Sequence, residues 1–277
     1  MTIQLFDRRT LLVGTTAGLL TLPALLKADG EYGIFKMGIQ SYSLRHFPID
    51  EALKMTHDLG LKYIEIYPEH LPMTDDPKKL AEYHDMLRRH EIRLWSYGVV
   101  SFHNDEKDAR RVFDFAKAMS IRTISAYPTL DSAEMLDRLA NEYKINIAIH
   151  NHGPGDKLYD LIEKEAKAFE GRSVRYGACE DTGHRLRSDE DPAEAIAKWG
   201  KRVHSIHMKD VKGGKGEEKE FTELGKGSLR AAAIINTLTV NKFRGILALE
   251  YEEHEDDPIP YIKPCLVTAK KLTNKVS

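Results

Sequence analysis

Short apolar segments alternate with amphipathic segments from Lys36 to the end of the chain, and this alternation restricts the fold more than any other feature. The apolar segments have the length and composition of buried strands, whereas the segments between them have the apolar spacing of helices. The predicted strands are 37–43, 63–67, 92–98, 122–127, 145–150, 174–181, 203–208 and 245–251. The predicted helices are 49–59, 77–90, 107–119, 131–143, 156–169, 192–200, 228–240 and 258–272.

Strands that alternate with helices in this way indicate βαβ units, in which successive strands are parallel. The even number of strands and the length of 277 residues favour closure into a single (β/α)8 TIM barrel over an open, doubly wound sheet. No Gly-x-Gly-x-x-Gly sequence follows the first strand, so the fingerprint of a dinucleotide-binding fold is missing. No linker-like composition divides residues 31–277, and we expect them to form one domain.

The composition argues against two classes of protein. Apolar residues make up 42% of the chain and charged residues 30%, and 41 basic against 43 acidic residues give a net charge of −2. Proteins that bind nucleic acid usually carry an excess of positive charge, so this balance argues against a nucleic-acid partner. Two cysteines, Cys179 and Cys265, are too few for a disulfide-stapled protein.

Residues 1–30 have the features of an export signal. The pair Arg8-Arg9 precedes an apolar, uncharged run over residues 11–26, and small residues follow it. Paired arginines before such a run resemble a Tat-type signal, which predicts export to the periplasm. The run is short for a membrane span. An uncleaved anchor is therefore the less favoured alternative, and no stable membrane insertion is expected beyond the signal.

Polar side chains stand at or next to the carboxyl ends of four predicted strands, namely those of His150, Asp181, His207 and Glu250. Burial of such groups is costly unless something pairs with them. Because side chains alternate along a strand, these groups should point into the barrel together with Glu65 of the second strand. The carboxyl ends of barrel strands meet at one mouth, where barrel enzymes keep their active sites.

A single divalent metal ion would pair with all four of these strand-end residues. Mixed imidazole and carboxylate ligands suit Zn, Mn, Co or Mg, and two imidazoles favour a transition metal. Such a site can leave a position open for substrate oxygens and can polarise a carbonyl group. Each residue also has a simpler explanation, because a carboxylate can form a salt bridge and a core histidine can be hydrogen-bonded.

Several short motifs resemble those of the xylose-isomerase-like TIM-barrel superfamily, the sugar phosphate isomerases and epimerases. They are Asp181-Thr182-Gly183-His184, His207-Met208-Lys209-Asp210, Leu224-Gly225-Lys226-Gly227 and Leu249-Glu250. The resemblance covers nearly all of the chain after residue 37. It implies that the metal is held by His150, Asp181, His207 and Glu250, and that His184 contacts the substrate.

One departure from the family pattern affects the expected chemistry. Epimerases of this superfamily usually carry Glu at the end of the fifth strand, and paired carboxylates then move the proton. This chain has His150-Asn151-His152 instead, which argues against the two-carboxylate mechanism. We favour His150 over His152 as the ligand because of its position at the strand end.

The remaining candidate residues are assigned as follows. Glu250 is the leading candidate for the catalytic base, with Glu65, His152 or Lys209 as its counterpart. Gln40 and Trp95 are further candidates for binding substrate, since an indole ring can stack on a sugar. Core packing explains Trp95 equally well.

The sequence therefore predicts a metal-dependent sugar isomerase or epimerase, or a related lyase, that acts on a small carbohydrate. One alternative is a phosphodiesterase similar to endonuclease IV, which would need a three-metal cluster. Another is a barrel that binds a sugar or a metal without catalysis. One metal ion per chain would favour the sugar enzyme, and three ions per chain would favour the phosphodiesterase. The sequence leaves open which sugar is bound and whether the chain forms a homo-oligomer.

Overall fold

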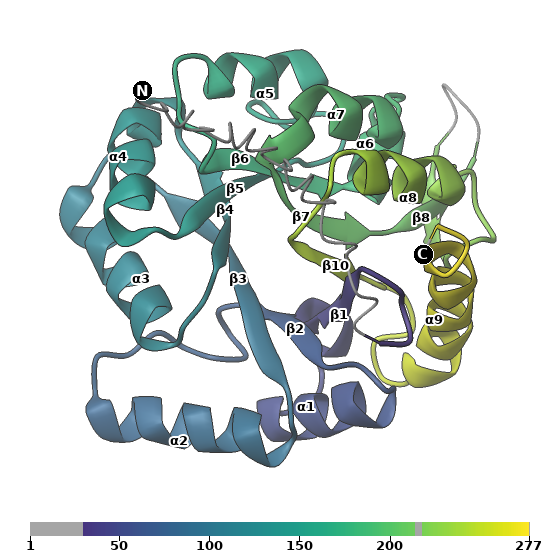
Figure 1. The fold of residues 1–277 in the computed structure, drawn as a ribbon, viewed down its shortest axis with the longest axis horizontal. Helices are drawn as coiled ribbons and strands as arrows, with labels where there is room; N and C mark the ends of the chain where they lie inside the picture. Colours follow the sequence, from purple (N-terminus) through teal and green to yellow (C-terminus); the bar gives the residue numbers. More distant parts are fainter. Residues whose placement is uncertain (1–29, 214–217, 277) are drawn as a thin grey trace, which may run out of the picture.

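The computed structural model describes residues 30–213 and 218–276, so the predicted export signal lies outside the described residues except for Gly30. The described residues form a closed barrel of eight parallel strands, and helices surround it (Figure 1). Around the barrel the strand order is β1-β10-β7-β6-β5-β4-β3-β2. The prediction of a single (β/α)8 barrel is confirmed.

The observed elements match most of the predicted ranges. The barrel strands are β1 Lys36–Gln40, β2 Tyr63–Ile66, β3 Arg93–Phe102, β4 Thr123–Pro128, β5 Asn146–His150, β6 Tyr176–Asp181, β7 Val203–Met208 and β10 Ile246–Leu249. The helices are α1 Ile49–Asp58, α2 Pro77–Arg89, α3 Glu106–Ala118, α4 Ala133–Tyr143, α5 Ile162–Phe169, α6 Thr182–Arg187, α7 Pro192–Trp199, α8 Ala231–Val240 and α9 Ile259–Thr273. An antiparallel pair outside the barrel consists of β8 Asp210–Lys212 and β9 Glu220–Thr222.

Aspartate caps explain where several helices begin. The side chains of Asp76, Asp105 and Asp191 accept hydrogen bonds from backbone N–H groups in the first turns of α2, α3 and α7. The helix predicted over 156–169 begins only at Ile162. Asp156 does not start it, because its Oδ1 accepts from the backbone N–H groups of the next residues and its Oδ2 accepts from the Tyr127 hydroxyl.

Side chains alternate along the strands as the pattern predicts. On β2, Ile64 and Ile66 belong to the hydrophobic core, whereas Glu65 between them is hydrogen-bonded to polar groups of neighbouring strands. The parallel register sets Asp181 of β6 beside His207 of β7. It is this register that brings polar residues distant in sequence to one end of the barrel.

Within the described residues, no helix combines the length and the apolar character that a membrane span requires.

His204 lies near the start of β7, at the opposite end of the barrel from the strand-end residues above. It is only 9% exposed, and its Nε2 donates a hydrogen bond of 2.8 Å to the carbonyl oxygen of Val174. Burial, with added repulsion from Arg175 and Arg202, lowers the pKa of His204 to about 4. The folded protein therefore holds a neutral imidazole here.

This depressed pKa predicts a pH-dependent loss of stability. Between the ordinary pKa of histidine and about 4, the unfolded chain takes up a proton at His204 that the folded chain does not, so stability falls as the pH is lowered through this window. We expect His204→Gln to reduce the stability lost between pH 7 and pH 5 by about 2 kcal/mol. Urea unfolding at both pH values measures the difference. The exposed His103→Gln is the matched control, and an equal loss in wild type and H204Q would contradict the prediction.

Candidate metal centre

Four strand-end residues from different parts of the chain meet inside the mouth of the barrel. His150 ends β5, Asp181 ends β6, His207 is the last residue but one of β7, and Glu250 directly follows β10. One ligand atom from each lies within 4.8 Å of the ligand atoms of the others. All four side chains are buried, with exposed fractions of 8% or less. The arrangement brings together the four residues that the sequence predicts as ligands.

The spacing of the donor atoms suits a metal ion. His150 Nε2 lies 3.1 Å from His207 Nδ1 and 3.4 Å from Asp181 Oδ2. His207 Nδ1 lies 3.8 Å from Asp181 Oδ2 and 2.9 Å from Glu250 Oε2. A tetrahedral ion with bonds of about 2.1 Å places its ligand atoms about 3.4 Å apart. His150, rather than His152, belongs to this cluster.

The two carboxylates each present an oxygen that lacks a hydrogen-bond partner. Asp181 Oδ1 accepts from the backbone N–H of His184 and so caps α6, whereas its Oδ2 has no hydrogen bond of good geometry. Glu250 Oε2 likewise has no hydrogen bond of good geometry. Burial opposes ionisation of Asp181, but Lys209 and the nearby histidines hold its pKa well below the usual range. Lys209 Nζ lies 3.0 and 3.1 Å from these two oxygens, so they are ion-paired but have no well-aligned hydrogen bond, and buried carboxylate oxygens of this kind fit a site for a cation.

Glu65 lies behind His207 and positions it. His207 Nε2 donates to Glu65 Oε1 over 2.8 Å, which leaves His207 Nδ1 facing the cluster. Gln40 Nε2 donates to the same oxygen over 2.8 Å, and Ser96 Oγ donates to Oε2 over 2.5 Å. Burial raises the pKa of Glu65, but His207 and these hydrogen bonds more than offset it, and the pKa lies below its usual value. Such a carboxylate–histidine pair fixes the tautomer of a metal ligand.

This position corrects the predicted catalytic role of Glu65. Its side chain is fully buried and does not line the pocket at the mouth. The strand alternation placed Glu65 inside the barrel correctly, but its carboxylate there is bonded to His207, Gln40 and Ser96 instead of facing the pocket.

We expect Glu65→Gln to weaken metal binding about 10- to 100-fold, because glutamine keeps the shape but not the charge that holds His207 Nδ1 as an acceptor. Competition with a chromophoric chelator measures the affinity. Glu134→Gln, on the exposed face of α4, is the control for the loss of one negative charge. An unchanged metal affinity in E65Q would contradict the role of Glu65 in positioning His207.

Lys209 is an ammonium group at the edge of the cluster. Its Nζ lies 3.0 Å from Asp181 Oδ2 and 3.1 Å from Glu250 Oε2, and it also contacts Glu252. Burial alone would lower the pKa of Lys209, but these three carboxylates raise it well above its usual range. The side chain therefore stays protonated and is a hydrogen-bond donor beside the cluster.

A pocket of about 330 Å³ opens above these groups. Two neutral histidines line it, since burial is the main cause that lowers the pKa of His152 to about 4 and that of His184 to about 3. Gln40 reaches the pocket but is engaged with Glu65. The residues that line the pocket are Gln40, Tyr42, Tyr67, Pro68, Glu69, Gly98, Val99, His150, His152, His184, Lys209, Glu250 and Glu252.

The structure corrects the prediction that Trp95 binds substrate. Trp95 lies near the start of β3, which extends to Phe102, whereas the predicted strand ended at residue 98. Its ring lines a different pocket, with the first residues of β1 and β4, at the amino-terminal end of the barrel. The predicted strand was too short, and Trp95 was placed too close to the mouth.

Seven pocket residues were missed by the sequence analysis, among them Tyr42, Tyr67 and Glu252. Tyr42 and Tyr67 follow β1 and β2 and pack edge-on with ring centroids 5.4 Å apart. Each tyrosine comes just after the end of a strand, and this position in the sequence could have pointed to them. Glu252 belongs to an acidic run after Glu250, and it contacts Lys209 in the pocket.

A buried ion-pair cluster joins β6 to two helices. Glu180 pairs with the fully buried Arg185 of α6, with Nε to Oε1 at 2.9 Å. Arg185 also contacts Glu165 of α5 and Glu190. The cluster ties α6, whose first turn carries His184, to β6 and α5.

The described geometry can be compared with known proteins. A family model described as the xylose isomerase-like TIM barrel matches residues 53–266. The chain is 28% identical over 138 residues to an inosose dehydratase of Clostridium beijerinckii, and the match covers 44% of this chain and 46% of that protein. The chain thus spans about half the length of the curated relatives that it matches.

Solved structures share the fold at low sequence identity. A structure of the IOLI protein with a binding zinc atom has a TM-score of 0.66 at 18% identity, and the match covers 87% of this chain and 98% of that one. A D-psicose 3-epimerase solved in the presence of D-fructose has a TM-score of 0.67 at 14% identity, with coverage of 86% and 99%. At these identities the likeness shows the fold alone.

Proposed function

Because the chain belongs to the xylose isomerase-like TIM-barrel family, we propose that it is a metal-dependent enzyme that modifies a carbohydrate or a related polyol. The observation that carries this proposal is the buried set of four ligand atoms within 4.8 Å of one another, beneath a pocket of about 330 Å³. The chemistry is removal of a proton from a carbon next to a carbonyl group, as in an isomerase or epimerase.

The donor set fits a divalent ion held by His150, Asp181, His207 and Glu250. Two imidazole nitrogens and two carboxylate oxygens suit zinc, manganese or cobalt. When bound, the ion would draw electron density from a substrate oxygen and make the neighbouring C–H group more acidic.

The side chains of the pocket supply the proton transfers. We assign Glu250 as the base, because its carboxylate lines the pocket and ionises readily beside Lys209. His152, which is neutral and has an unpartnered Nδ1, is the second candidate acceptor. Lys209 stays protonated, so it would stabilise a developing oxygen anion by a hydrogen bond, and its proton can pass only to a strongly basic leaving hydroxide.

A dehydratase is a second candidate activity. The relatives with sequence similarity include inosose dehydratases, and the proton donor Lys209 lies next to the base Glu250. With base and acid on neighbouring strands, one face of the substrate can lose a proton and a hydroxyl group. In addition, the mouth has His150 at the end of β5, the position at which an epimerase would need its second carboxylate.

The two activities are separated by one experiment. The metal-loaded protein is incubated with keto-sugars and keto-inositols in heavy water, and the products are analysed by mass spectrometry. Deuterium incorporation without loss of mass supports an isomerase or epimerase, and loss of water supports a dehydratase. A panel without exchange or water loss would overturn the proposed function.

The phosphodiesterase alternative has less support. Among residues 30–213 and 218–276, the second group of potential ligands is Glu65, Cys179 and His207, and it shares His207 with the first. Since His207 Nε2 is bonded to Glu65, the geometry suits one ion rather than three. Metal analysis of the purified protein should give about one ion per chain, as expected for a single four-ligand site.

We also propose that the protein is exported to the periplasm. This rests on the Arg8-Arg9 pair and the apolar run after it, which lie outside the described residues. Replacement of both arginines by lysine should leave the protein in the cytoplasm, as cell fractionation and immunoblotting would show. Export of the double-lysine variant at the wild-type level would contradict Tat-type transport.

A further inference from the structure

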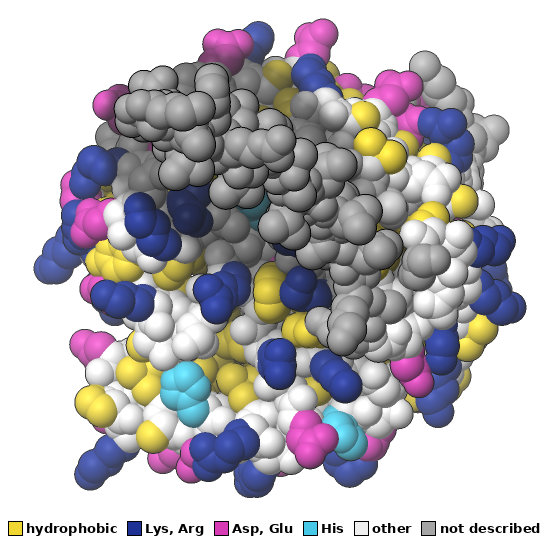
Figure 2. Space-filling view, in the orientation of Figure 1, with side chains coloured by type: hydrophobic (Ala, Val, Ile, Leu, Met, Phe, Trp, Pro, Cys, Tyr) yellow, Lys and Arg dark blue, Asp and Glu magenta, His cyan; other side chains and the backbone are white. Residues whose placement is uncertain are grey.

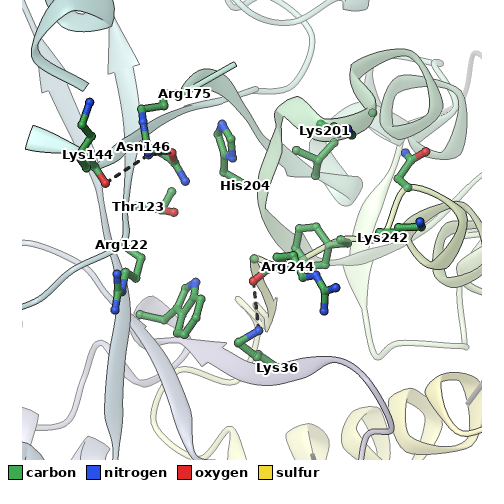
Figure 3. Close-up of a pocket in the computed structure, with 16 residues that line it drawn as sticks. Lys36, Arg122, Thr123, Lys144, Asn146, Arg175, Lys201, His204, Lys242 and Arg244 are labelled. Atoms are coloured by element: carbon green, nitrogen blue, oxygen red, sulfur yellow. Dashed lines mark hydrogen bonds between the residues drawn. The ribbon is translucent and has the colours of Figure 1, made fainter. Parts of the chain in front are cut away.

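A second and larger pocket lies at the amino-terminal end of the barrel, away from the metal ligands. Its volume is about 710 Å³, within the range of pockets that hold small ligands. It is formed where the first residues of β1, β3, β4, β5, β6, β7 and β10 come together (Figure 3).

The lining of this pocket is strongly basic. Seven of its side chains are cations, and no Asp or Glu side chain lines it. Figure 2 shows Lys and Arg side chains gathered near the centre of the same face. The net charge of the whole chain is −2, so this concentration of positive charge is local. The cations are Lys36, Arg122, Lys144, Arg175, Lys201, Lys242 and Arg244.

Most of these cations lack a carboxylate partner. Within the part of the chain that the structure describes, no ion pair forms at Arg122, Lys144, Lys201, Lys242 or Arg244. Arg175 donates instead to the Lys144 carbonyl and to Asn146 Oδ1. Gathered like charges repel one another unless a counter-charge is bound. Elsewhere on this protein exposed arginines are commonly paired, as Arg110 and Arg138 are with Glu142 and Glu106.

A simpler explanation covers only part of this set. Helix carboxyl ends lie at this end of a parallel barrel, and cations there stabilise the helix dipole. Lys144 caps α4, and Lys201 and Lys242 lie just after α7 and α8. Arg122, Arg175 and Arg244 instead precede β4, β6 and β10 and are drawn around the same cavity.

The pocket also offers a flat ring and neutral polar groups. The half-buried Trp95 is held by Tyr63, with ring centroids 5.7 Å apart, and by Lys36 Nζ, which lies 4.7 Å from the indole centroid. Thr123 and Asn146 add hydrogen-bonding groups. A site with many cations and one aromatic wall suits a ligand with several negative charges, since a single chloride would neutralise little of the field.

We propose that this amino-terminal pocket binds a small anion that carries more than one phosphate group. The phosphates would be held by Arg122, Arg175 and Arg244, whose planar guanidinium groups match phosphate oxygens. The chemistry is shared by a free polyphosphate compound and by the headgroup of an anionic lipid, and the experiment separates these two sources. The inference does not depend on the activity at the mouth of the barrel.

The test uses the full chain with its metal and inorganic tripolyphosphate as the probe. Isothermal titration calorimetry at low salt should detect binding that is weakened about tenfold or more by Arg122→Glu with Arg244→Glu, and by added salt. The matched control is Lys107→Glu with Lys263→Glu, which changes the net charge equally on exposed residues of α3 and α9. Tripolyphosphate also binds divalent ions. None of the compared variants changes a residue of the metal centre, so this contribution to the signal is the same in all of them.

A second arm measures flotation with vesicles of cardiolipin, whose headgroup carries two phosphates, or of phosphatidylcholine. Binding to tripolyphosphate alone supports a free polyphosphate ligand, and selective binding to cardiolipin that is lost in the double arginine variant supports a lipid headgroup. Equal weakening by the two double variants would show diffuse attraction and overturn the site, as would absence of binding to both probes. Circular dichroism and the melting temperature establish that each variant is folded.

Discussion

Glu250→Gln should lower the rate of substrate C–H exchange by about 10²- to 10⁴-fold, the usual contribution of a general base. Glutamine has nearly the same shape but accepts no proton, and its amide oxygen is a weaker metal ligand. Glu250 also contacts Lys209 and His207, so the charge balance of the cluster changes with it. Exchange in heavy water measures the rate, and metal analysis of the same sample measures occupancy.

The neighbouring Glu253→Gln is a close control, because it makes the same chemical change on an exposed side chain of the same loop. Its exchange rate should equal that of the wild type. If E250Q keeps its metal and exchanges at the wild-type rate, Glu250 is not the base, and His152 becomes the leading candidate.

Removal of the metal by a chelator should abolish activity and lower the melting temperature by about 5–10 °C relative to protein in a hundredfold excess of metal over its dissociation constant. Without the ion, the buried carboxylates Asp181 and Glu250 keep only Lys209 and the histidines as partners. Differential scanning calorimetry measures the shift, and readdition of zinc, manganese or cobalt should restore both properties.

His150→Ala separates specific from general effects of the chelator. This variant loses one of the four ligands, so its melting temperature should respond little to chelator or added metal. A wild-type enzyme that stays active and equally stable after complete metal removal would contradict the proposed centre.

Much of the fold could be predicted because the apolar segments are distinct. The strand 203–208 and the starts of the helices at residues 49, 77 and 192 agree with the structure. The late start of α5 was not predictable from spacing, because Asp156 is a good cap whose bonds go to a local turn and to Tyr127. The short helix α6 was hidden because it begins at Thr182, directly after the last residue of β6.

The candidate ligands could be predicted because each ends a strand, and parallel strands end at one mouth. The depth of a side chain along the barrel axis could not be predicted. Glu65 and Trp95 were placed in the pocket, yet the carboxylate of Glu65 is bonded to His207 and does not line the pocket, and Trp95 lies at the far end of the barrel. Such depth depends on strand register and strand length, which periodicity does not encode.

The state of Lys209 has a consequence for substrate choice. Among the described residues that line the mouth pocket, Lys209 is the only lysine or arginine, and three carboxylates already surround it. A phosphorylated sugar would bring its dianion toward Glu69 and Glu252, and no further lysine or arginine of the described pocket lining is there to receive it. The mouth should therefore discriminate by charge and admit uncharged sugars in preference to their phosphate esters.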